Sequence, residues 1–122
     1  MKRRAVAEIE VSDFLLDSSI AHRSTAPGTF HSRKSIQVTT VDKLVEDLRL
    51  ARVDFIKIDV EGVEELVLRG AMVTLERYRP KLSISSYHID FNNEPQHDKL
   101  VKILLGKGYQ IRTKRKYHIY AW

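Results

Sequence analysis

Two polar segments of the sequence carry side chains that could accept a proton. Asp59 and Glu61 flank Val60 at the end of a β-branched run, and His88 follows Tyr87 at the end of a later one. In an open α/β sheet, ligands bind outside the carboxyl ends of the strands. If the two strands are neighbours, Asp59, Glu61 and His88 meet at one edge of the sheet. A carboxylate or an imidazole placed there can act as a general base.

The same residues have simpler explanations. Asp59 and Glu61 could stabilise the start of a helix that begins after Gly62, because carboxylates are favoured at the positive end of a helix. A histidine at a strand end is often an ordinary loop residue. Together with Asp90, these side chains could also supply ligands for a divalent metal. Their spacing does not demand a metal, however, and the sequence predicts no metal site.

The elements that would position these residues alternate between strands and helices. The predicted order is a strand at 6–11, a loop at 17–35, a strand at 36–38, a helix from 39 or 40 to about 52, a strand at 53–60, a helix at 63–78, a strand at 82–87, a helix ending at 106, and strands at 109–113 and 117–121. This alternation favours an α/β fold with mostly parallel strands. The basic turn at 114–116 joins the last two strands into an antiparallel hairpin.

Two helical positions carry specific expectations. Thr39 or Thr40 is predicted to cap the helix that follows. Thr39 and Asp42 lie three residues apart, the spacing at which a hydroxyl and a carboxylate satisfy free amides in the first turn of their own helix. Gly70 lies inside the predicted helix at 63–78, where glycine costs about 1 kcal/mol relative to alanine. We therefore expect a close packing contact or a local break at Gly70.

The composition indicates a small globular protein. A chain of 122 residues with 43% hydrophobic and 30% charged residues can bury one core, so residues 1–122 are predicted to form a single domain with a flexible loop at 17–35. No apolar run approaches the roughly 20 residues that a membrane span needs. The absence of cysteine excludes disulfides and thiol catalysis. A cytoplasmic location fits these features, and no signal sequence is expected.

The net charge of +5 is concentrated in two clusters, at residues 2–4 and 112–116, and the rest of the chain is close to neutral. Such clusters can attract phosphate backbones. A solvated terminus and a solvated turn explain them equally well, so nucleic-acid binding is not the predicted function.

One segment resembles the hallmark of a known family. Residues 54–71 read DFIKIDVEGVEELVLRGA, which is similar to the segment of FkbM-family methyltransferases in which a strand ending in KIDVEG precedes an acidic residue, an apolar helix and a Gly-Ala pair. Flanking segments agree at 40–44, 80–88 and 104–109. The resemblance covers residues from about Ser35 to Trp122.

The resemblance implies a partial class I methyltransferase fold, which is a Rossmann-like, mostly parallel sheet with a C-terminal antiparallel hairpin. It also implies S-adenosylmethionine as the cofactor and O-methyl transfer to a small molecule or a sugar. On this basis Asp59 and His88 are the predicted catalytic residues, either of which could take the acceptor's proton. Asp59, Glu61 and Gly62 are predicted to bind the cofactor, and Glu61 is also a candidate for positioning the substrate.

One feature of the family is missing from the sequence. Family members begin with a strand, a Gly-rich turn and a helix, and no such unit precedes Ser35. The sequence therefore predicts the C-terminal portion of the domain, and two hypotheses follow. The first is a methyltransferase completed by a separate N-terminal half or by homo-oligomerisation. The second is an inactive remnant that serves as an oligomerising or interaction module, so the sequence leaves open whether the chain is an enzyme.

Overall fold

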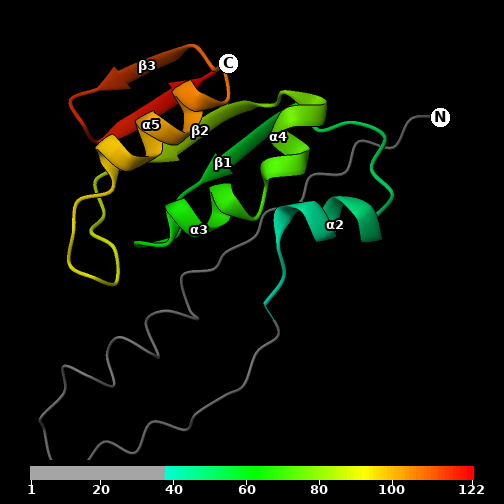
Figure 1. Cartoon of the computed structure of the whole chain (residues 1–122), viewed down its shortest axis with the longest axis horizontal. Coiled ribbons are helices and arrows are strands. Elements are labelled where there is room, and N and C mark those ends of the chain that lie inside the picture. The colour runs from blue at the N-terminus through cyan, green and yellow to red at the C-terminus, as the bar shows by residue number, and fades with distance from the viewer. Residues whose placement is uncertain (1–37) are drawn as a thin grey trace, which may run out of the picture.

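The computed structural model describes residues 38–122 (Figure 1). The predicted strand at 6–11, the loop at 17–35 and most of the strand at 36–38 lie outside these residues. The described elements are α2 (Val41–Asp47), β1 (Phe55–Ile58), α3 (Glu64–Arg69), α4 (Met72–Tyr78), β2 (Lys81–Ser85), α5 (His97–Gly106), β3 (Ile111–Lys114) and β4 (His118–Ala121). Between 38 and 122, no helix is long and apolar enough to cross a membrane.

The elements form a mixed α/β structure with a four-stranded sheet in the order β1-β2-β4-β3. β1 pairs with β2 in parallel, whereas β4 pairs antiparallel with both β2 and β3. The prediction of a mostly parallel sheet is therefore wrong for these strands. The hairpin itself is confirmed, but it places its second strand next to β2, which makes two of the three pairings antiparallel.

The basic segment at 114–116 forms the turn between β3 and β4. The backbone amide of Tyr117 donates to the carbonyl of Lys114 at 3.0 Å. Arg115 and Lys116, at the centre of the turn, have φ values of 52° and 57°. Two consecutive positive φ values give a tight turn whose twist matches that of the flanking strands.

One face of the sheet packs against the helices. α3 and α4 follow one another beside β1, and α5 lies along the hairpin (Figure 1). The fully buried apolar side chains come from both layers: Leu68, Leu75, Leu100 and Leu104 from the helices, and Leu82, Ile84 and Ile119 from the strands. On the opposite face of the described sheet, Phe55 and Tyr120 are 58% and 44% exposed. The core is therefore one-sided in this part of the chain.

The predicted continuous helix at 63–78 is two helices, separated at Gly70 and Ala71. The carbonyl of Gly70 accepts a hydrogen bond from the backbone amide of Asp42 at 2.9 Å. A Cβ atom on Gly70 would lie 3.1 Å from Cβ and Cγ2 of Thr40. Both expectations for Gly70, a close contact and a local break, are confirmed.

The carboxylate of Asp42 caps a different helix from the predicted one. The start of α2 is capped by Thr40, whose Oγ1 accepts from the amide of Lys43 at 3.1 Å. Asp42 instead accepts from the amides of Val73 at 3.0 Å and Thr74 at 2.7 Å, and from the Thr74 hydroxyl at 2.7 Å. Of the two predicted caps, Thr40 is confirmed and Thr39 is not. The predicted capping role of Asp42 in its own helix is wrong, because tertiary packing brings the start of α4 within reach.

Replacing Asp42 by alanine should lower the free energy of unfolding by about 1–2 kcal/mol, because α4 loses its cap and Thr74 loses its partner. Urea denaturation followed by far-UV circular dichroism would measure the change. Asp47→Ala is the matched control, since Asp47 makes only an exposed pair with Lys43 at 2.8 Å. Exposed pairs contribute little, so equal losses in the two variants would contradict this role for Asp42.

Candidate functional site

The parallel pairing of β1 and β2 brings the three predicted site residues to one edge of the sheet. Asp59 directly follows β1, and His88 follows β2 after a short connection. The Nε2 atom of His88 lies 3.3 Å from a carboxylate oxygen of Glu61 and 3.9 Å from one of Asp59. The expected convergence is confirmed, and we call Asp59, Glu61 and His88 the rim.

A fourth residue, Glu64, lies behind the rim and binds both His88 and the turn that carries Glu61. Its side chain is fully buried, with 0% exposed. Its carboxylate is 2.6 Å from Nδ1 of His88 and accepts from Nε2 of Gln96 at 2.7 Å. It also accepts from the backbone amides of Gly62 at 3.1 Å and Val60 at 3.3 Å. One carboxylate thus links the end of β1, the start of α3, the segment after β2 and the start of α5.

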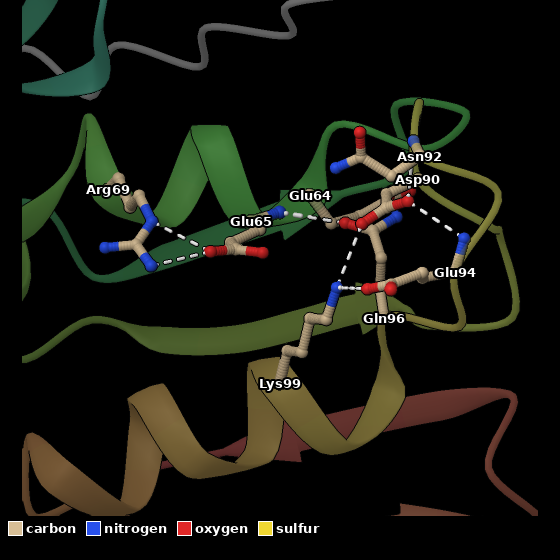
Figure 2. Close-up of polar contacts among 8 residues, drawn as sticks. All are labelled: Glu64, Glu65, Arg69, Asp90, Asn92, Glu94, Gln96 and Lys99. Carbon is tan, nitrogen blue, oxygen red and sulfur yellow. Dashed lines mark hydrogen bonds and ion pairs between the residues drawn. The ribbon is translucent and has the colours of Figure 1, made fainter.

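The sequence indicated Glu64 only as part of the family motif and gave it no role. The residue stands next to Glu65, which has the same side chain. Glu65 instead forms a partly exposed ion pair with Arg69 at 2.6 Å (Figure 2). Figure 2 also shows Gln96 reaching from the start of α5 to Glu64. Packing against α5 therefore determines which of the two adjacent carboxylates is buried behind the rim.

The hydrogen bond to Glu64 determines which nitrogen of His88 is free. A carboxylate only accepts hydrogen bonds, so Nδ1 carries the hydrogen and a neutral ring has its lone pair on Nε2. The His88 side chain is 9% exposed, whereas those of Asp59 and Glu61 are 39% and 50% exposed. Within the described residues, Nε2 is buried without a hydrogen-bond partner. The rim therefore presents an oriented lone pair between two accessible carboxylates.

The turn between β1 and α3 has a strained backbone that Gly62 makes possible. Glu61 and Gly62 have φ values of 54° and 111°. A Cβ atom on Gly62 would lie 2.5 Å from the carbonyl oxygen of Ile89. This close approach gives Gly62 a packing role, and it holds Glu61 opposite His88. The predicted contact between Gly62 and a cofactor stays a prediction.

The helix-capping alternative for Asp59 and Glu61 is not what the structure shows. Val63 occupies the N-cap position of α3 and makes no side-chain capping hydrogen bond. The amide of Glu65 in the first turn is satisfied by the side-chain oxygen of Gln96 at 3.2 Å. The carboxylates of Asp59 and Glu61 are therefore not used to start this helix.

Asp90 belongs to the loop before α5 and not to the rim. Its carboxylate accepts from the amides of Glu94 and Asn92, each at 2.9 Å, and lies 3.1 Å from Nζ of Lys99 (Figure 2). The hydrogen bond from the Glu94 amide, supported by Lys99 and the Asn92 amide, holds the pKa of the Asp90 carboxyl below its ordinary value of 3.8. Asp90 thereby closes the loop that positions Gln96.

Two of the hollows on the surface of the described residues differ in their relation to the rim. One of about 510 Å³ lies on β3 and β4, at the other edge of the sheet from β1, and is lined by Arg112, Thr113, Lys114, Tyr120 and Trp122. The other, of about 290 Å³, is lined in part by Gly62, Leu66, Phe91 and Lys99. Only the second borders the turn that carries Glu61, so the larger hollow is not part of the rim.

Comparison with known proteins adds one finding. A family model described as the methyltransferase FkbM domain matches residues 6–111. The match begins before Ser35, where the sequence resemblance was expected to start, and it includes the whole rim together with Glu64 and Gln96. No curated protein and no solved structure gives a significant match.

Proposed function

The chain belongs to the FkbM methyltransferase domain family, and on that basis we propose that it transfers a methyl group from S-adenosylmethionine to a hydroxyl oxygen of a small molecule or sugar. The observation that carries this proposal is the His88 imidazole, which Glu64 orients through a 2.6 Å contact so that Nε2 faces two accessible carboxylates. The alternative of an inactive interaction module does not account for such a prepared rim.

The sheet supports a class I methyltransferase architecture. β1, β2 and β3 run in the same direction, because β4 is antiparallel to both β2 and β3 and β1 is parallel to β2. The one reversed strand, β4, lies between β2 and β3 and forms the C-terminal hairpin expected for this fold. The rim then occupies the carboxyl ends of two parallel strands, where ligands bind in open α/β sheets.

Methyl transfer to a hydroxyl requires removal of its proton as the oxygen attacks. Of the two predicted bases, the geometry favours His88, because Nε2 already bears the lone pair and Glu64 can stabilise the positive ring that results. The acceptor oxygen forms the new C–O bond, and its proton passes to Nε2. Asp59 and Glu61 would hold the acceptor or the cofactor beside the ring.

The exposed carboxylates fit the predicted cofactor. S-adenosylmethionine carries a sulfonium, an amino group and ribose hydroxyls, which are cationic or hydrogen-bond-donating groups that carboxylates bind. Asp59 and Glu61 would bind such groups, and Gly62 would contribute by holding Glu61 in place. When bound, the cofactor supplies the methyl group, and its sulfur keeps the electron pair of the broken S–CH3 bond.

The predicted partner is a second copy of the chain or a separate N-terminal half. Support for either comes from β1, which is an edge strand of the described sheet and carries Phe55 with 58% of its surface exposed. Exposed edge strands pair readily with further strands. A partner of either kind would extend the sheet next to Asp59.

Replacing His88 by alanine should lower the rate of methyl transfer by about 10²–10⁴-fold, the usual effect of losing a general base. The measurement is transfer of labelled methyl from S-adenosylmethionine to a panel of hydroxylated acceptors. Calorimetry measures the binding of S-adenosylhomocysteine to the unmodified chain. When its concentration is ~100 times the dissociation constant, this ligand should raise the free energy of unfolding by about 2.7 kcal/mol.

His118→Ala is the matched control, since this histidine lies on β4 and contacts the Ser83 hydroxyl through Nε2 at 2.8 Å. It should retain most of the methyl-transfer rate. If the chain neither binds S-adenosylhomocysteine nor transfers methyl groups, the proposed function fails. If His88→Ala and His118→Ala are equally active, His88 is not the general base.

A further inference from the structure

The nitrogen Nε2 of His88 needs an explanation that the hydrogen bonds of the chain do not supply. It is buried without a partner among the described residues, on a side chain that is 9% exposed. Buried polar atoms in proteins nearly always have a partner, whether protein, water or ion. A carboxylate oxygen of Glu61 lies 3.3 Å away, but it accepts hydrogen bonds just as the lone pair on Nε2 does, so it is not a partner for this atom. The atom is thus positioned toward a group that the chain itself does not provide.

The rim has the chemistry of a metal-binding site. One ligand atom from each of Asp59, Glu61 and His88 lies within 4.8 Å of the other two. Ligands on a common Zn²⁺ lie at about 2.0–2.2 Å from it, so the three atoms must move closer together to share one ion. The side chains of Asp59 and Glu61 are 39% and 50% exposed and have room to do so. Two carboxylates neutralise a divalent charge, and an imidazole ligand favours a transition metal over Mg²⁺ or Ca²⁺.

The contacts of the other ring nitrogen of His88 also agree with a metal-binding site. A metal-bound histidine usually donates its other ring N–H to a carboxylate, which fixes the tautomer and the ring orientation. Here Glu64 is that carboxylate, at 2.6 Å from Nδ1, and it is itself held by Gln96 at 2.7 Å. The ring is therefore oriented from behind before any ion binds. Because Asp59 and Glu61 are exposed, positions remain on the ion for water or for a hydroxyl.

We propose that Asp59, Glu61 and His88 form a binding site for a divalent transition-metal ion such as Mn²⁺ or Zn²⁺, with Glu64 as the residue that orients His88. Its part in catalysis rests on the proposed function: the ion would bind the acceptor hydroxyl and promote loss of its proton. In that form the lone pair of His88 binds the ion, and the proton passes to solvent. Binding of the ion itself does not depend on methyl transfer.

Mn²⁺ is the probe for the test, because free and bound Mn²⁺ differ in their electron paramagnetic resonance signal. The full chain should bind one Mn²⁺, and the double variant Asp59→Asn/Glu61→Gln should bind it more than about 100-fold more weakly. Glu64→Gln keeps all three ligands but weakens the support of His88, so a loss of about 10–100-fold is expected. Glu65→Gln, the neighbouring carboxylate outside the rim, should leave binding unchanged.

Two results would overturn the metal site: no Mn²⁺ binding by the unmodified chain, or equal binding by the chain and the double variant. The assays separate this inference from the proposed function. Methyl transfer that continues at full rate in excess EDTA, with Mn²⁺ still bound in its absence, would refute the catalytic role of the ion alone. Tight Mn²⁺ binding together with no methyl transfer would confirm the site and refute the proposed function.

Discussion

Replacing Glu64 by alanine is expected to lower the free energy of unfolding by about 3–5 kcal/mol, the largest loss among the substitutions considered. The carboxylate is fully buried and serves four donors, from His88, Gln96 and the amides of Gly62 and Val60. Alanine would leave these donors unsatisfied in the interior, and each such group costs about 1–3 kcal/mol. Urea denaturation followed by circular dichroism would measure the loss.

The neighbouring Glu65→Ala is the matched control, because it removes the same side chain from the same helix. Glu65 pairs with Arg69, whose side chain is 60% exposed, and exposed pairs contribute less than about 1 kcal/mol. Glu64→Gln should fall between the two variants, since its amide keeps one acceptor oxygen but turns an NH2 group toward the donors. If Glu64→Ala and Glu65→Ala lose the same stability, the four-way contact does not hold this part of the fold together.

Replacing Gly62 by alanine should cost about 3 kcal/mol of unfolding free energy. The backbone there has a φ of 111°, which residues with a Cβ rarely adopt, and the added Cβ would lie 2.5 Å from the carbonyl oxygen of Ile89. Relief of that contact must move the turn or the segment after β2. Because these two segments carry Glu61 and His88, the variant should also weaken any ligand binding at the rim. Differential scanning calorimetry measures the first effect and Mn²⁺ titration the second.

Gly106→Ala provides the control within the same chain. Gly106 is the last residue of α5, and a Cβ atom there would meet nothing within 4 Å. Alanine should raise stability by about 0.5–1 kcal/mol, because it reduces the freedom of the unfolded chain at a position that tolerates a side chain. A gain at Gly106 together with a loss at Gly62 is the expected pattern. A change of the same sign and size at both positions would show that the clash at Gly62 relaxes freely.

Much of the local structure could be predicted from the sequence because it depends on neighbouring residues. The alternation of strands and helices follows from hydrophobic periodicity, and Pro80 marks the end of α4 because proline cannot continue a helix. The break at Gly70 follows from its low helical propensity. The meeting of Asp59 with His88 also follows once β1 and β2 are taken as neighbours, because parallel strands end at the same edge.

The remaining features depend on contacts between residues far apart in the sequence. Periodicity shows that residues 118–121 form a strand but not that it lies next to β2. The antiparallel pairing of β2 with β4 was therefore not predicted, although the parallel β1–β2 pair and the hairpin were. Asp42 lies at the ideal spacing for a local cap, yet it binds Thr74, 32 residues away. In both cases the local pattern fits two arrangements, and packing selects one.

Glu64 shows the physical reason most clearly. Glu64 and Glu65 are chemically identical neighbours at the start of one helix, and nothing in their spacing says which is buried. The structure decides it by placing His88 and Gln96, 24 and 32 residues further along the chain, around the first carboxylate. The sequence by itself determined which residues could do chemistry at the edge of the sheet. Only the tertiary structure determined which nitrogen of His88 is free to do it, because that depends on a hydrogen bond that forms when β1, β2 and α5 pack together.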